Sequence, residues 1–397
     1  MTDRQSGRTV AVPQFSGEQK VMAVLLLFVP ATLLASHLNA APALQFFLSV
    51  GSVIPLAAYI SAATEGVASK LGGKVGGLLN ATFGNAPDLL VGIFGVQKGL
   101  IPLVKATLVG ALISNSALIM GLCYIVAGLR FRHPRFNRYE AGHHSVLMML
   151  TIGAILFPSV GALFICGDTA CVSPAVSGDV DNISVGVGIV LLLSYAAYVV
   201  YSIFHLQGAR PLGGVESRIQ VERAREERIE NWPVLFSVIV LGLSTAALIP
   251  ITDILTGSVE PVTRVLGWTQ VFVGIVIVAN AGNVAEGYAA IKFAFSRGGV
   301  DPSRTDSGLD LALGIASASS IQIATFVAPL VVLYSVTTHT MNLVFSPVEI
   351  AILALLVLIF TYTAQDGESN WLEGAQLLAL YLMAAIVFFF LPVRAFV

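Results

Sequence analysis

Two short polar stretches interrupt long apolar runs of this 397-residue sequence, and each contains one carboxylate. Residues 84–88 read GNAPD and end in Asp88, whereas residues 282–286 read GNVAE and end in Glu286. On a helix, residues three apart share a face, so each stretch presents the amide oxygen of its asparagine beside its carboxylate. An ionisable side chain inside an apolar segment is costly and normally faces a cavity or a partner, which indicates a functional site.

The chemistry of these two stretches is that of a cation site. Asn85 with Asp88, and Asn283 with Glu286, together supply four oxygen-bearing side chains and two negative charges. Hard divalent cations prefer oxygen ligands, and Ca²⁺ takes about six to eight of them in loose geometry. Because neither stretch contains Cys or His, copper and zinc are less favoured than calcium.

Additional oxygen donors lie on the apolar runs that follow each stretch. We expect Ser114 and Asn115 in the first half, and Ser319 with Gln322 in the second, to extend the ligand set. Backbone carbonyls and water would supply the remaining oxygens. For Ser114 and Asn115, hydrogen bonds between helices are an equally good interpretation.

Protons can compete with a metal ion for the same carboxylates. Withdrawal from water disfavours the charged form of a carboxylate, so a site without its cation would take up protons on Asp88 and Glu286. Protonation on one side of the membrane would release the cation, and deprotonation on the other side would recharge the site. Two further acids, Glu65 and Glu260, lie near predicted span ends, where they are either solvated or part of a proton relay or gate.

Composition places these residues in a membrane protein. Charged residues make up 11% of the sequence and apolar residues 56%, and the mean hydropathy is +0.85; soluble domains have roughly 25% charged residues. Apolar runs of about 20 residues predict membrane-spanning helices, because barrel strands need only about ten. The predicted fold class is therefore an all-α polytopic membrane protein with eleven spans, near 19–38, 43–63, 75–97, 101–128, 143–165, 183–206, 233–256, 266–295, 307–336, 344–363 and 370–391.

The distribution of Lys and Arg predicts the orientation in the membrane. With a cytoplasmic N-terminus, 16 of the 21 basic residues fall on inner segments. Only Lys98, Lys105, Arg264 and Arg394 fall outside, and Lys292 lies inside a span. This bias predicts a cytoplasmic N-terminus and a C-terminus outside. We expect the membrane to be the inner (plasma) membrane of a bacterium.

Two loops carry further information. Cys166 and Cys171 share a predicted outer loop without Lys or Arg, and in an oxidising compartment they either form a disulfide or stay unpaired. The long polar interruption at 207–232 has both charge signs at helical spacing, which predicts a surface helix at the cytoplasmic face. We interpret this segment as a solvated connector between the two halves of the chain.

The two halves follow the same order of features. Glu65 precedes a Leu-Gly pair by six residues, as Glu260 does, and each acid is followed by one of the two polar stretches. Five predicted spans separate the two stretches, and an odd number reverses the direction of crossing, so the repeats are inverted. Inverted repeats around a central site predict alternating access in a secondary transporter. The predicted organisation is a tail with the first helix (1–42), a five-helix repeat (43–206), the charged linker helix (207–232) and a second five-helix repeat (233–397).

These motifs resemble the signature repeats of the cation/proton exchanger (CAX) family, within the calcium/cation antiporter superfamily. The resemblance rests on residues 63–99 and 282–286, and it extends to SSIQIATFVAPL from Ser319 and DGESNWLEG from Asp366. It implies an extra first helix, two inverted sets of five helices, and export of Ca²⁺ against inward proton movement, without a cofactor. By this resemblance the core carboxylates fall on Asp88 and Glu286, the amide ligands on Asn85 and Asn283, further polar ligands on Ser319 and Gln322, and secondary acids on Glu65 and Glu260.

The sequence departs from the family pattern at three positions beside the site. The family usually has Glu at position 88, Ala, Val or Thr at 87 and His at 287, where this chain has Asp88, Pro87 and Gly287. Asp is shorter than Glu by one C–C bond, about 1.5 Å, whereas Pro87 cannot donate to the carbonyl of Phe83. That freed carbonyl of Phe83 is a candidate ligand that would compensate for the shorter acid. Loss of the histidine removes a proton acceptor near neutral pH.

Other functions remain open on sequence grounds. A Na⁺ or K⁺/H⁺ exchanger would need only one charged carboxylate per cycle, and Mn²⁺ also prefers oxygen ligands. A cation channel would place acids in a pore, although inverted repeats argue against it. An enzyme is not expected, because no nucleophile and base occur at matching depth. The expected partners are inorganic cations, protons and the lipid bilayer; nucleic acid is not expected, and a homo-oligomer stays open.

Overall fold

The computed structural model describes residues 17–71, 79, 82–131, 133–136, 138–166, 174–204, 232–296 and 308–391. These residues are predominantly helical, and the only β-type pairing among them is an isolated bridge between Arg135 and Glu368. The first half contains α1 (Gly17–Leu25), α2 (Phe28–His37), α3 (Pro42–Leu71), α5 (Ala86–Gln97), α6 (Ile101–Ile113), the π-helical segment η1 (Ser114–Ile119), α7 (Met120–Phe131), α8 (Arg138–Cys166) and α9 (Pro174–Phe204). The second half contains α11 (Val234–Leu266), α12 (Gln270–Phe272), the π-helical η2 (Val273–Val278), α13 (Ala279–Phe295), α14 (Leu309–Gln322), the π-helical η3 (Ile323–Val327), α15 (Ala328–Ser335), α16 (Pro347–Asp366) and α17 (Trp371–Phe390).

The number of spans agrees with the sequence prediction. Within the described residues, 9 helical segments are long and apolar enough to cross a membrane, and the shorter apolar segments Val21–His37 and Ala86–Gln97 accompany them. Several helices are longer than their predicted spans. α3 runs to Leu71, beyond the predicted end at 63, and α9 begins at Pro174, before the predicted start at 183. α11 continues beyond the predicted end at 256 and stops only where Gly267 adopts a left-handed conformation, with φ 69°. Hydropathy missed these last turns since they carry the charged residues Glu260 and Arg264.

Some predicted features cannot be compared with the structure. The linker helix predicted over 207–232 lies almost entirely outside the described residues, which resume at Trp232. Cys171 and the side chain of Cys166 also lie outside them, so the expected disulfide stays a prediction.

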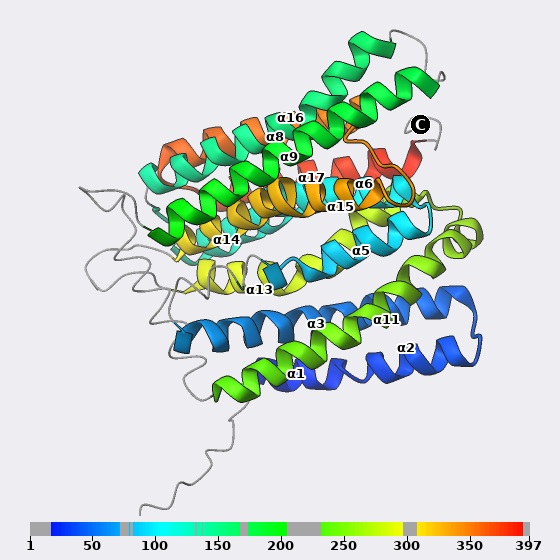
Figure 1. The fold of residues 1–397 in the computed structure, drawn as a ribbon. Helices are drawn as coiled ribbons and strands as arrows, with labels where there is room; N and C mark the ends of the chain where they lie inside the picture. Colours follow the sequence, from blue (N-terminus) through cyan, green and yellow to red (C-terminus); the bar gives the residue numbers. More distant parts are fainter. Residues whose placement is uncertain are drawn as a thin grey trace, which may run out of the picture.

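The helices form two layers (Figure 1). In this view α3 and α11 lie side by side in the lower layer with α1 and α2, and the other helices lie above them. A hydrophobic cluster joins the layers, because Ile60 of α3 and Ile251 of α11 are buried in one cluster with Leu103 of α6 and Val273 of η2. The helices that carry the two polar stretches, α5 and α13, belong to the upper layer and face this cluster.

Glycines let the backbones of the central helices come into direct contact. A Cβ atom on Gly110 of α6 would lie 2.5 Å from Cα of Ile275 in η2. A Cβ atom on Gly374 of α17 would lie 2.5 Å from the carbonyl oxygen of Gly121 in α7. No side chain fits at such distances, so these residues permit the close approach that is typical of packed membrane helices.

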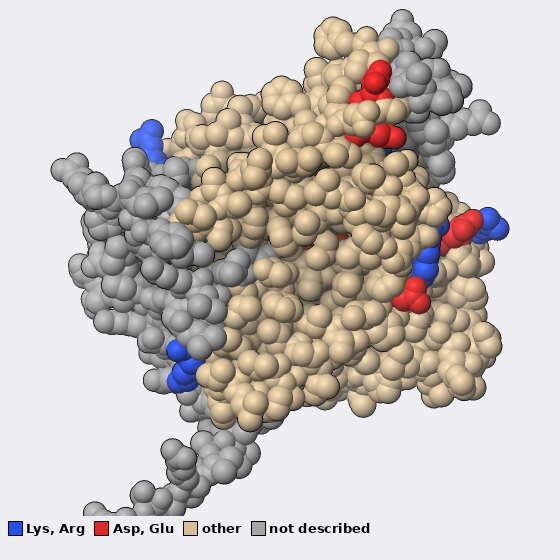
Figure 2. Space-filling model, in the orientation of Figure 1, with Lys and Arg blue, Asp and Glu red and all other residues tan. Residues whose placement is uncertain are grey.

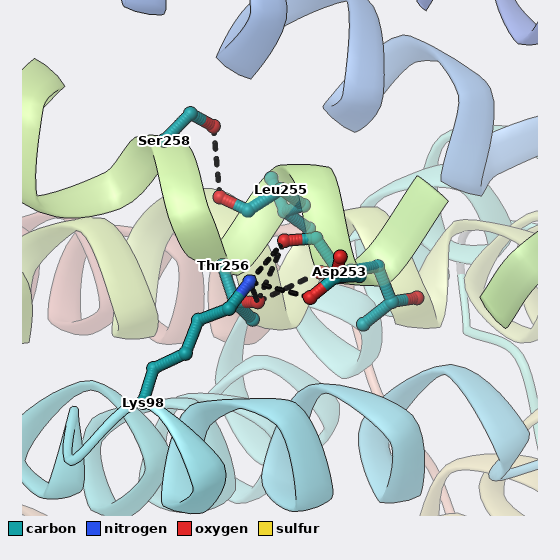
Figure 3. Close-up of polar contacts among 6 residues, drawn as sticks. Lys98, Asp253, Leu255, Thr256 and Ser258 are labelled. Atoms are coloured by element: carbon teal, nitrogen blue, oxygen red, sulfur yellow. Dashed lines mark hydrogen bonds and ion pairs between the residues drawn. The ribbon is translucent and has the colours of Figure 1, made fainter. Parts of the chain in front are cut away.

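A lysine ties the end of α5 to α11 (Figure 3). The ammonium group of Lys98 donates to the carboxylate of Asp253 at 2.6 Å, to the backbone carbonyl of the same residue at 2.5 Å and to the hydroxyl of Thr256 at 3.1 Å. Exposed ion pairs contribute little stability, roughly 0–1 kcal/mol, and Asp253 is half-exposed. The main effect of Lys98 is therefore to fix the position of the α5 end relative to α11.

The segment 341–346, between α15 and α16, is held by side chains rather than by backbone pairing. Lys105 of α6 donates to Oδ1 of Asn342 at 2.6 Å and to the carbonyl of Val344 at 2.9 Å. Serine hydroxyls of three helices accept three of its backbone amides: Met341 donates to Ser335 of α15, Leu343 to Ser184 of α9, and Phe345 to Ser159 of α8. Lys105 lies in the second turn of α6, within the predicted span 101–128, and its ammonium group is bound by the segment 341–346.

Candidate cation site

The first polar stretch lies where a helix begins. Residues 84 and 85 form a turn, and α5 starts at Ala86 with Pro87 and Asp88 in its first turn. Proline suits this place because the first N–H groups of a helix have no intrahelical acceptor. The Asp88 side chain is buried, and the positive end of the α5 dipole favours its negative charge.

The second polar stretch lies inside a continuous helix. Asn283 is buried within α13, and Glu286 follows it on the same face one turn later. A Cβ atom on Gly282 would lie 3.1 Å from Oδ1 of Asp88 and 3.6 Å from Cβ of Pro87. The carboxylate of Asp88 therefore rests against the backbone of the second stretch, one helical turn before Glu286 on the same face of α13. The structure brings the two carboxylates together, as the sequence predicted.

The asparagines of the two stretches form crossed pairs between the halves. Asn85 donates through Nδ2 to Oε1 of Gln322 in α14, at 2.7 Å. Asn283 donates through Nδ2 to Oδ1 of Asn115 in η1, at 3.4 Å, which is a long hydrogen bond. Each amide thus binds the helix that follows the other stretch. Since both donate through nitrogen, their Oδ1 atoms remain available to another ligand.

Two serine hydroxyls of the site, those of Ser114 and Ser319, do not bond to their own helix as the neighbouring hydroxyls do. On the same helices, five buried hydroxyls donate to the carbonyl four residues earlier, as is common for Ser and Thr in helices: Thr107, Ser116, Ser317, Ser320 and Thr325. Ser114 instead donates across to Oδ1 of Asn280 at 2.6 Å. Ser319 Oγ makes no hydrogen bond of normal geometry among the described residues, although the Glu286 carboxylate lies close enough to interact with it.

Three buried polar atoms of the site lack a hydrogen-bond partner within the described part of the chain. They are Oε2 of Glu286, Oγ of Ser319 and Nδ2 of Asn115. An unsatisfied buried polar group costs about 1–3 kcal/mol, so three together are unusual. Oε2 of Glu286 and Oγ of Ser319 are oxygens that suit a cation, whereas Nδ2 of Asn115 is a donor and cannot ligate one.

Sequence reasoning missed two features of the site. π-helical segments adjoin it three times: η1 begins at Ser114, η3 directly follows Gln322, and η2 ends two residues before Asn280. Such segments occur frequently at functional sites, but no residue pattern predicts them. Asn280 was also missed, although a polar residue three positions before Asn283 shares its helix face and could have been recognised.

The two secondary acids lie in different surroundings. Glu65 is half-buried in α3, and Glu260 is exposed near the end of α11, where it pairs with Arg264 one turn later. For Glu260 this geometry favours a solvated ion pair. A role for Glu65 in a proton relay or gate stays a prediction.

The position where the resembled family has a histidine is closed in this chain. A Cβ atom on Gly287 would lie 3.1 Å from Cδ1 of Ile119, which is in η1. A histidine would therefore require Ile119 to move. The loss of the histidine and the presence of Ile119 thus belong to one local arrangement.

The surface of the molecule agrees with a site inside an apolar body. Figure 2 shows one face that is almost free of charge, crossed by a groove in which carboxylate atoms are visible, while other charges gather at the two ends of the helices. Among the described residues, no three His, Cys, Asp or Glu side chains converge on one point. A metal ion at this site would therefore depend on amide, hydroxyl and backbone oxygens in addition to Asp88 and Glu286.

The fold and this site define a class: a helical membrane protein whose two halves each supply one acidic polar stretch to a common centre. The sodium/calcium exchanger protein family matches residues 41–204 and 236–390, and the chain belongs to that family.

Individual relatives are similar over nearly their whole length. The Ca²⁺/H⁺ antiporter ChaA of Bacillus subtilis is 34% identical over 365 residues, which cover 91% of this chain and 97% of the relative. A Ca²⁺/H⁺ antiporter of Synechocystis is 34% identical over 390 residues, 95% of this chain and 99% of the relative. Among solved structures, native YfkE has a TM-score of 0.75 and 32% identity, covering 93% of this chain and all of that one.

Proposed function

We propose that this protein is a secondary transporter that exchanges Ca²⁺ for H⁺. Support comes from two Ca²⁺/H⁺ antiporters that are 34% identical to this chain and match it over nearly its whole length. The single observation that carries the proposal is the meeting of Asp88 and Glu286 in a buried site beside unpartnered oxygens. Two negative charges for which the described residues supply no counter-ion suit a divalent cation in one state and protons in the other.

The proposed ligand set follows from the contacts of each side chain. Asp88 and Glu286 supply the charge, and Asn85 and Asn283 present Oδ1 because their nitrogens are engaged with the opposite half. The remaining proposed donors are Ser114, Asn115, Ser319, Gln322 and the backbone carbonyl of Phe83. The carbonyl of Phe83 lies at a helix end, directly before the turn at residues 84 and 85, where carbonyls have no intrahelical donor and can face a cation.

The transport cycle requires the two carboxylates to alternate between metal and protons. Protonation of Asp88 and Glu286 would neutralise the site and release Ca²⁺, and deprotonation on the other side would restore two negative charges. The crossed amide pairs join residues of both proposed repeats, 43–206 and 233–397, so a relative movement of the halves would reach the ligands directly. This is the arrangement expected for alternating access around a fixed site.

A flux assay in proteoliposomes tests this proposal. Purified protein is reconstituted with a pH-sensitive dye inside the vesicles, and Ca²⁺, Mn²⁺, Na⁺ or K⁺ is added in separate arms. We expect saturable proton movement with Ca²⁺ and none with Na⁺ or K⁺. A response to Na⁺ or K⁺ that exceeds the Ca²⁺ response would replace the proposal with monovalent cation exchange, and a flux that stays linear with cation concentration would indicate a channel.

The orientation with the N-terminus in the cytoplasm and the C-terminus outside rests on the distribution of basic residues, and it is tested by labelling. In a cysteine-free background, Thr338→Cys in the segment after α15 and His133→Cys in the segment after α7 place single exposed thiols at opposite ends of the bundle. A membrane-impermeant maleimide applied to intact bacterial cells should label the first thiol only. The opposite pattern would reverse the orientation.

A further inference from the structure

Asn280 holds an unusual position between the candidate cation site and the last helix. Its Oδ1 accepts from Ser114 at 2.6 Å, and its Nδ2 donates to the backbone carbonyl of Val276 at 2.7 Å and to the hydroxyl of Tyr381 at 2.6 Å. Both amide hydrogens and the oxygen of this one side chain are therefore engaged. Its three partners lie on η1, η2 and α17.

The direction of these hydrogen bonds is fixed by Val276. A backbone carbonyl can only accept, so the group of Asn280 that faces it must be the nitrogen. The oxygen of Asn280 must then face Ser114, and because an amide oxygen also only accepts, Ser114 must donate its proton to it. The orientation of one backbone carbonyl thereby determines where the Ser114 proton points.

The consequence for Ser114 is that its hydroxyl proton points across to α13, and no group in the described part of the chain donates to its Oγ. Nearby hydroxyls such as Ser116 donate to the carbonyl four residues earlier and lie along their own helix. Ser114 instead leans toward α13, the helix that carries Asn283 and Glu286. We propose that Asn280 is a positioning residue that holds Ser114 away from its own helix so that Ser114 Oγ serves as a ligand of the transported cation.

This inference rests on the proposed function and is tested by a double-mutant cycle in the full-length protein. Asn280→Leu keeps the volume and removes the acceptor, so Ser114 should turn to the carbonyl of Gly110, four residues earlier. We expect the KM for Ca²⁺ in proteoliposomes to rise about tenfold, as for loss of one charge-assisted contact, with little change in kcat. Ser114→Ala should raise the KM by a similar factor, and the double variant should be no worse than Ser114→Ala alone.

Two further variants separate positioning from packing. Ser116→Ala removes a neighbouring hydroxyl that bonds only to its own helix, and it should leave the KM unchanged. Tyr381→Phe removes one partner of Asn280 but leaves the Val276 carbonyl to orient the amide, so its KM should rise by less than about threefold. Size-exclusion profiles of all variants show whether they fold as the wild type does.

The outcomes distinguish this inference from the proposed function. If the effects of Asn280→Leu and Ser114→Ala multiply in the double variant, or if Asn280→Leu lowers kcat alone, Asn280 does not act through Ser114 and the inference fails. If the wild type moves no protons in response to Ca²⁺ but does so with another cation, the proposed substrate fails. The same cycle, measured with that cation, then decides the role of Asn280.

Discussion

The two acidic stretches carry the same chemistry on different backbones. The first begins α5, with a turn at residues 84 and 85 and Asp88 in the first helical turn. The second lies within α13, so Glu286 has an intact helix on both sides. Asp88 thus benefits from a helix end that favours negative charge, whereas Glu286 has no such support and keeps a buried oxygen without a partner among the described residues.

This difference suggests how a shorter acid can serve in one half of the site. Asp88 reaches the centre from a helix start that rests against Gly282, where no side chain intervenes. Glu286 reaches the centre with one more carbon from the interior of α13. The two carboxylates are therefore not interchangeable, although their motifs correspond, and the variants below test this asymmetry.

The largest effect should come from removing either charge. Glu286→Gln keeps the size of the side chain but removes the group that binds the cation and carries the proton, so calcium-driven proton flux should fall to that of protein-free vesicles. Asp88→Asn should do the same. Retained flux in Glu286→Gln would contradict the mechanism, and retained flux in only one of the two variants would show that a single carboxylate suffices.

Lengthening the acid of the first half should have the next largest effect. Asp88→Glu pushes a carboxylate into the space beside Gly282, and we expect about a tenfold loss of activity, equivalent to ~1.4 kcal/mol. Pro87→Val combined with Asp88→Glu should regain much of the lost activity. Without the proline, α5 can begin earlier, which would move the longer side chain away from Gly282. Transport rates of the two single variants and the double variant provide the test. Losses that simply add would mean that Pro87 and Asp88 are not a compensated pair.

A methyl group at the contact between the two stretches should have an intermediate effect. Gly282→Ala would place Cβ 3.1 Å from Oδ1 of Asp88, tighter than ordinary contact, so the carboxylate must shift. We expect a rise of about three- to fivefold in the KM for Ca²⁺, less than 1.4 kcal/mol. Gly314→Ala in α14 is the matched control, since a Cβ there meets nothing within 4 Å. Equal effects of the two substitutions would place the cause in helix propensity instead.

The smallest effect should come from opening the position next to Glu286. Ile119→Ala with Gly287→His makes room for an imidazole that the wild type excludes. Because histidine changes its charge between about pH 5 and 8, the variant should keep its rate at pH 8 and acquire a new dependence on pH below 7. The test is calcium-driven proton flux measured across this pH range, with Ile119→Ala alone as the control. Identical pH profiles for the control and the double variant would show that the imidazole does not reach the site.

The sequence was sufficient to predict the spans and the pairing of the acids, for physical reasons. Burying a carboxylate in an apolar run is so costly that Asp88 and Glu286 stand out without a structure. Apolar runs of spanning length likewise leave little choice of fold. The crossed pair of Asn85 with Gln322 was not predicted as such, although both residues were expected as ligands.

The remaining features depend on contacts between distant parts of the chain. The role of Asn280 follows from the direction of a backbone carbonyl at Val276, which no residue type reveals. The sequence gives no acceptor for the Lys105 ammonium group, which the distant segment 341–346 supplies in the structure. Similarly, α11 ends at Gly267 rather than at the loss of hydropathy, because a left-handed glycine stops a helix independently of polarity.

The segment 341–346 has a consequence for measuring motion in solution. The amide hydrogens of Met341, Leu343 and Phe345 each bond to a serine of a different helix, α15, α9 and α8. An amide exchanges with heavy water only when its bond opens, so one short peptide reports separately on three helices. A transport step that separates α9 from this end of the bundle would expose the Leu343 amide to exchange while the amides of Met341 and Phe345 stay protected. Hydrogen exchange in this segment would therefore show which of the three helices moves.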